Sequence, residues 1–146
     1  MMTEQAQDVC LLYELRRSDI TEIATRLSEA LSEDRRVNAD MFDITRTTFS
    51  QNRHPNATMR ALEAELENAD LPFLQLLVAL SQIGMEASQG LGDFADRDAF
   101  ANAVGEELEA LSRRNAPAYV LAHSLTEIKA EHALKRLSTA IRYMEM

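Results

Sequence analysis

The sequence of 146 residues has few of the residues that interrupt helices, with four glycines and three prolines. This composition argues against an all-β fold, which needs many tight turns. The single cysteine, Cys10, excludes an internal disulfide, and no basic segment precedes an apolar stretch at the start. We therefore expect a cytoplasmic protein. Unbroken apolar runs such as residues 76–80 are far shorter than the roughly 20 residues that cross a bilayer, so we expect no membrane protein.

Acidic side chains outnumber basic ones by 24 to 15, but the charges are sorted along the chain. Residues 1–34 carry 8 acidic and 3 basic side chains, and residues 61–112 carry 11 and 1. The other two segments are basic, because residues 35–60 carry 5 basic and 2 acidic side chains and residues 113–146 carry 6 and 3. Two basic segments on one surface would suit a polyanion, whereas alternating blocks also help helices of one chain to pair. Both interpretations stay open here.

Apolar residues recur at helical spacing through nearly the whole chain, and no segment alternates long enough with the period of a strand. The spacing predicts a first helix at residues 3–16 with Val9, Leu12 and Leu15 together on its inner, apolar side. A second helix should start at the capping box Asp19-x-x-Glu22. Two short helices should follow at residues 36–42 and 45–53.

Three later helices have side chains that can cap their N-termini, and these are Asn56, Asp70 and Asp96. The helix after Asp70 is apolar nearly all round from residue 73 to residue 83, which is typical of the buried centre of a domain. The sequence therefore predicts an all-α fold. We expect a helical bundle around this central helix, in one domain that covers residues 1–146.

The last predicted helix, residues 118–144, changes its apolar face along its length. Leu121, Leu125 and Ile128 lie on one face. The residues on the opposite face are Leu134, Leu137, Ile141 and Met144. This second face predicts a homodimer interface, within a candidate oligomerisation region at residues 97–146. The alternative is a kink, or a helix that its own chain covers on both sides.

Patterns typical of metal, haem and catalytic sites do not occur. The sequence has no His-Glu-x-x-His motif, no Gly-rich phosphate loop and no Gly-x-Ser-x-Gly. His123, Glu127 and Glu131 are spaced four residues apart on one helix, which is more typical of a surface salt-bridge row than of a metal site. Cys10 lies among apolar residues and lacks the features of a nucleophile, so we expect it to be a small core residue. We expect no enzyme, no metal and no cofactor.

One segment in the first basic block, residues 37–51, carries a recognisable order of residue types. A small residue, Ala39, is followed four positions later by Asp43, then by the aliphatic Ile44 and by Thr45. This order resembles the helix-turn-helix of DNA-binding regulators of the lambda-repressor and Cro-like kind. In that family the small residue lies where the two helices cross, and the Ser or Thr caps the recognition helix.

The resemblance implies a DNA-binding transcriptional regulator, with residues 35–60 as its DNA-binding part. The side chains implied for the recognition helix are Thr45, Arg46, Thr47, Ser50 and Gln51, with Arg53 beyond its end. Arg reads guanine and Gln reads adenine in the major groove. Arg36 and Arg60, together with Arg35, would contact phosphates.

The alternative function is an acidic all-helical adaptor or inhibitor that binds a basic protein partner. In this interpretation residues 61–112 present eleven carboxylates, which could imitate DNA. Retention on heparin or DNA at low salt distinguishes the two functions, because a regulator is retained and a DNA mimic is not.

Replacement of Arg46 by alanine tests the resemblance. If Arg46 makes a bidentate base contact, its loss costs about 1 to 3 kcal/mol of discrimination and abolishes the preference for the selected site. Arg36→Ala should instead weaken binding to every sequence and lower the salt slope by about one unit. The measurement is a titration on fragments selected from genomic DNA. Equal binding by Arg46→Ala and the wild type would exclude the recognition-helix assignment.

Overall fold

A computed structural model describes residues 3–45, 56–92 and 94–146, and of residues 37–45 only the backbone is described. These residues form six α-helices and no strand. The helices are α1 (Glu4–Thr45), α2 (Ala57–Glu67), α3 (Leu71–Ser88), α4 (Arg97–Arg114), α5 (Ala118–Thr126) and α6 (Ala130–Met144). The all-α fold in a single domain that the periodicity predicts is confirmed.

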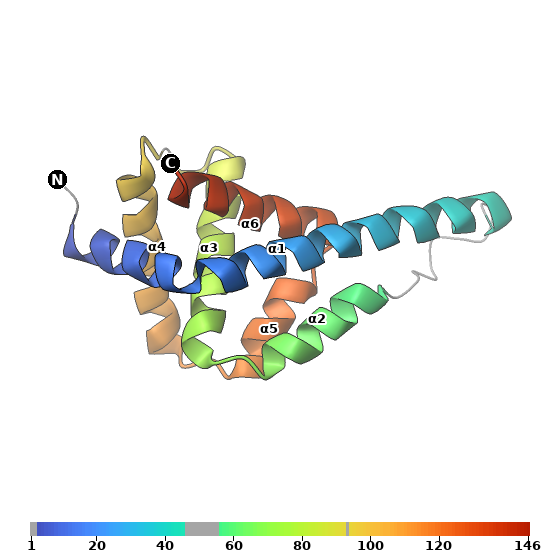
Figure 1. Cartoon of the computed structure of the whole chain (residues 1–146), viewed down its shortest axis with the longest axis horizontal. Helices are drawn as coiled ribbons and strands as arrows, with labels where there is room; N and C mark the ends of the chain where they lie inside the picture. Colours follow the sequence, from blue (N-terminus) through green and yellow to red (C-terminus); the bar gives the residue numbers. More distant parts are fainter. Residues whose placement is uncertain (1–2, 46–55, 93) are drawn as a thin grey trace.

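Helix α3 lies at the centre of the bundle, as its apolar character predicts. Leu74, Leu76 and Leu80 on this helix are fully buried, and α3 packs against α4, α5 and α6. Figure 1 shows α3 standing between α4 and α5, with α1 and α6 crossing it. By length and composition alone α3 could span a membrane, with a mean hydropathy of 1.2 and 44% of its residues buried by the rest of the chain. The same composition is typical of a core helix.

Helix α1 runs without interruption for 42 residues, so the predicted break between two helices before Asp19 is wrong. The sequence contains no glycine or proline before Pro55. Tyr13, Ile20 and Leu27 are buried at a spacing of seven residues, and this inner face continues straight past the predicted capping box. Asp19 lies inside the helix and pairs with Arg16, at 3.0 Å between the carboxylate and Nε.

The predicted short helix at residues 36–42 is part of α1, which continues to Thr45. The backbone is therefore helical at Asp43 and Ile44, where the helix-turn-helix resemblance places a turn. The rest of that segment, residues 46–55, lies outside the described residues, and the helix predicted at 45–53 falls largely there. In Figure 1 the C-terminal part of α1 extends beyond the other helices.

The predicted last helix is two helices, because residues 127–129 between α5 and α6 are not helical. The break lets each apolar face pack on the same core. Leu137 and Met144 are 1% exposed, and Leu134 and Ile141 are half-buried against the core. These four residues were predicted to form an exposed interface, and this is wrong because their own chain covers them. The homodimer stays a prediction, but the apolar face of α6 no longer supports it.

Helices α3 and α6 approach each other most closely at Gly84. A Cβ atom at this position would clash with the backbone carbonyl of Arg136. Gly105 on α4 also lacks room for a Cβ atom, but there the neighbour is the flexible side chain of Gln5. A backbone neighbour can move only if a whole helix moves, so the two glycines differ in what they tolerate.

We expect Gly84→Ala to lower the free energy of unfolding by about 1 to 3 kcal/mol, because overpacking forces α3 and α6 apart. Because the clash is with a backbone carbonyl, we expect a cost in the upper part of this range, which exceeds the gain of about 1 kcal/mol that alanine brings to a helix interior. Gly105→Ala is the matched control and should be neutral or stabilising. Urea unfolding followed by circular dichroism measures both, and equal effects in the two variants would contradict the close approach of α3 and α6.

Tyr13 anchors the inner face of α1 and is fully buried. Its hydroxyl has no hydrogen-bond partner of normal geometry. Burial, and after it the nearby Glu145 carboxylate, raises the pKa of Tyr13 to about 12. The phenol therefore holds its proton more tightly in the folded chain than in the unfolded chain, where its pKa is about 10.

This difference predicts that the free energy of unfolding falls as the pH rises from 10 to 12, because the unfolded chain ionises first. Below pH 10 the contribution is fully present. Tyr13→Phe should lose this part of the pH dependence, whereas Tyr119→Phe, at a side chain that is 64% exposed, should keep it. Urea unfolding at pH 8, 10 and 11 measures the effect. An unchanged alkaline decrease in Tyr13→Phe would show that another group causes it.

Candidate functional site

Most residues predicted to read DNA lie outside the described part of the chain. These are Arg46, Thr47, Ser50, Gln51 and Arg53. Thr45 is the last residue of α1. Arg36 and Arg60 are described, and both are exposed.

Arg35 and Arg60 come together at a surface hollow of about 590 Å³ between α1, α2 and the turn before α6. Lys129 also lines this hollow. The cations share it with four carboxylates, which belong to Asp34, Glu63, Glu127 and Glu131. Its lining is thus of mixed charge, and Arg36 is not part of it.

His123 is exposed and lies between two carboxylates. Its Nδ1 atom is 3.2 Å from Glu63, and its Nε2 atom is 3.5 Å from Glu127. The described residues contain no group of three or more side chains placed to hold a metal ion. The predicted row of His123, Glu127 and Glu131 on one helix is wrong, because α5 ends at Thr126 and Glu131 lies on α6. His123 contacts Glu127 and, across to α2, Glu63.

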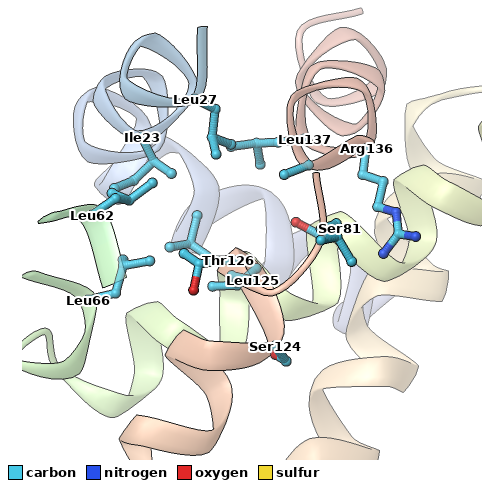
Figure 2. Close-up of a pocket in the computed structure, with 13 residues that line it drawn as sticks. Ile23, Leu27, Leu62, Leu66, Ser81, Ser124, Leu125, Thr126, Arg136 and Leu137 are labelled. Atoms are coloured by element: carbon cyan, nitrogen blue, oxygen red, sulfur yellow. The ribbon is translucent and has the colours of Figure 1, made fainter. Parts of the chain in front are cut away.

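A small cavity lies inside the bundle, where side chains of α1, α2, α3, α5 and α6 meet (Figure 2). Leu27, Leu62 and Leu137 form apolar walls, and Ser81 and Thr126 add hydroxyl groups. Its volume of about 30 Å³ holds one or two water molecules. This cavity has no room for a substrate.

The solvent side of α1 carries a continuous row of exposed residues, which we call the outer stripe. Its members follow one another at alternating spacings of four and three residues, and every one of them is exposed. They are Glu4, Asp8, Leu11, Leu15, Ser18, Glu22, Thr25, Glu29 and Ser32. Leu11 is 69% exposed and Leu15 is 78% exposed. The sequence-based placement of Leu15 on the inner side is therefore wrong.

The arginines of α1 that have described partners turn away from the outer stripe and bind the body of the protein. Arg16 contacts Asp70 on the N-terminus of α3, at 3.0 Å, and its guanidinium lies 4.3 Å from the centre of the Phe73 ring. Arg17 pairs with Glu145, and Arg26 pairs with Glu65 on α2. These contacts fix the inner and lateral sides of α1 and leave its outer side to solvent.

The ion pair at Asp70 also affects its ionisation. Burial favours the protonated carboxyl, but hydrogen bonds from Arg16 and from the Phe73 amide, together with the Arg16 charge, lower the pKa of Asp70 below its usual range. Asp70 is thus charged at neutral pH, where it caps α3 and binds α1 at the same time.

The carboxylates of the outer stripe are in a different situation. Among the described residues, Glu4, Asp8, Glu22 and Glu29 take part in no ion pair. In the acidic block 61–112, Glu65, Asp70 and Glu109 have cationic neighbours within the chain and Glu63 lies beside His123, whereas other carboxylates of this block, such as Glu67 and Glu106, also take part in no ion pair among the described residues. The carboxylates that remain without a cationic neighbour therefore include four on α1. The sequence analysis placed none of these four in a candidate site.

A second surface hollow, of about 340 Å³, borders the outer stripe at Leu11. Gln7, Cys10 and Glu14 of α1 line it, and Arg97 at the start of α4 closes it. Cys10 is 7% exposed, so the core position predicted for it is confirmed. The outer stripe and this hollow together form a surface that is acidic along its length and apolar near its N-terminal third.

The alternating spacing of the stripe was present in the sequence, but the predicted break before Asp19 concealed it. The exposure of the stripe could not be predicted from spacing alone, because the buried residues on the opposite face of α1 repeat with the same period of seven residues. Comparison with protein-family models, with curated proteins and with solved structures gives no match for this chain.

Proposed function

We propose that this chain is an acidic helical adaptor that binds a basic protein partner through the outer stripe of α1. The observation that carries the proposal is the pairing of two exposed leucines, Leu11 and Leu15, with carboxylates that have no ion pair among the described residues. Isolated exposed leucines are normal on protein surfaces. Here they lie one helical turn apart on one continuous helix and beside a hollow.

Burial of a leucine side chain contributes roughly 1.5 to 3 kcal/mol. Leu11 and Leu15 contribute almost none of this to folding, because both are more than two-thirds exposed. A partner that covers them gains most of it. The surrounding carboxylates raise the association rate of a basic partner and disfavour acidic ones.

DNA binding is the second candidate function, and one observation favours it. Arg35, Arg60 and Lys129 come from separate parts of the sequence and line one hollow. The four carboxylates in the same hollow weaken its attraction for phosphate. The helical backbone at Asp43 and Ile44 also departs from the turn that the resemblance requires.

Charge reversal at one position tests the adaptor function. The probe is a set of Lys- and Arg-rich helical peptides, with genomic DNA fragments as the competing ligand. We expect the wild type to bind the peptides, and Glu22→Lys to weaken this binding about tenfold because it places a cation at the centre of the contact. Fluorescence anisotropy at 50, 150 and 400 mM salt measures the affinity.

Glu67→Lys is the matched control, because Glu67 is exposed, lies on α2 away from the stripe, and changes the net charge equally. Its affinity for the peptides should stay close to that of the wild type. Equal weakening by both variants would mean that only net charge matters. Binding of DNA in preference to the peptides would support the second candidate and contradict the first.

A further inference from the structure

The outer stripe has the residue spacing of one seam of a coiled coil, although Leu11 and Leu15 are its only apolar members. Alternating steps of four and three residues give an average of 3.5, which keeps the row straight relative to a second helix that winds around the first. The row continues over residues 4–32, a length of about 42 Å at 1.5 Å per residue. No helix of the described chain covers it, since every member is exposed.

We propose, on the basis of the adaptor function above, that the partner contributes one basic amphipathic helix that lies along this stripe. A helix is the occupant whose own side chains recur every 3.5 residues, so it can meet each member of the stripe in turn. An extended peptide has a period of two residues and would match only isolated positions.

Charge disfavours a second copy of this chain as the occupant. In a parallel pair, each carboxylate of the stripe would face its own copy. In an antiparallel pair centred on Leu11 and Leu15, Glu4 would face Glu22. Both arrangements place like charges opposite each other along the seam, which is destabilising.

A partner helix with cations at these positions fits the stripe. Opposite Leu11 and Leu15 it needs two large apolar residues one turn apart. Opposite Glu4, Asp8, Glu22 and Glu29 it needs Lys or Arg. The spacing of the stripe converts to the pattern basic-x3-basic-x2-apolar-x3-apolar-x6-basic-x6-basic in a parallel partner, and to the reverse order in an antiparallel one.

The hollow beside Leu11 specifies where the apolar contact is deepest. It is large enough, at about 340 Å³, for a leucine or phenylalanine side chain of the partner. Its lining residues are Gln7, Cys10, Leu11, Glu14 and Arg97. Because Glu14 and Arg97 carry opposite charges, the hollow attracts neither cations nor anions strongly, so we assign an apolar side chain to it and the cations to the stripe.

The test uses two synthetic helical peptides of identical composition. The matched peptide carries the basic and apolar residues in the pattern above, and the shifted peptide carries the same residues distributed around the helix. We expect the matched peptide to bind the full chain at least tenfold more tightly and to gain helical circular dichroism on binding. Equal affinity of the two peptides would overturn the proposed pairing.

Replacement of the two leucines provides the second measurement. Leu11→Ser/Leu15→Ser should weaken the matched peptide at least tenfold and leave the shifted peptide almost unchanged. Leu91→Ser is the control, because Leu91 is 71% exposed and lies between α3 and α4. Thermal unfolding confirms that each variant is folded, as expected for replacements of exposed side chains.

The outcomes separate this inference from the function on which it rests. Equal binding of both peptides, with weakening by Glu22→Lys, retains the acidic adaptor and excludes helical pairing along the stripe. Failure of both peptides to bind excludes the adaptor as well. Self-association in sedimentation that Leu15→Ser abolishes would identify a second copy as the occupant and overturn the proposal.

Discussion

The arrangement of this protein depends on the seven-residue spacing of buried side chains along α1. Ala6, Tyr13, Ile20 and Leu27 are at most 5% exposed, and they keep one face of the helix on the body as it passes α4, α6 and α2. A helix of this length gains most of its stability from such packing rather than from intrinsic propensity. Since α1 stays straight, its opposite face is also continuous, and the outer stripe is a direct consequence of the inner one.

The structure explains part of the uneven distribution of charge along the sequence. Arg16, Arg17 and Arg26 are the three cations of the first acidic block, and all of them pair with carboxylates that α1 or other helices supply. Part of the charge pattern therefore serves packing between helices of the chain. This was one of the two interpretations of the charged segments in the sequence analysis. Among the carboxylates that these cations leave without an ion pair, Glu4, Asp8, Glu22 and Glu29 lie on the side of α1 that faces solvent.

The sequence allowed the later helices to be predicted well because their signals are local. Asn56, Asp70 and Asp96 each accept a hydrogen bond from the third following amide, as N-caps do. The capping box at Asp19 is an equally good local signal, but the apolar face that continues past it dominates. The prediction that Val9, Leu12 and Leu15 share one side failed for a different reason. Two steps of three residues place Leu15 about 120° around the helix from Val9, and thus away from the inner face.

The candidate surface could not be predicted as a whole, because it depends on which side of α1 the body leaves uncovered. Once that side is known, its residues have distinct roles in the proposed binding. The carboxylates select a basic partner but tolerate sliding, since charges act over about 8 Å at physiological salt. Leu11 and Leu15 act only on contact and are the two apolar members of the stripe, so they fix the register. Because α1 is helical already in the unbound chain, it presents both sets in place, which reduces the entropy that binding must overcome.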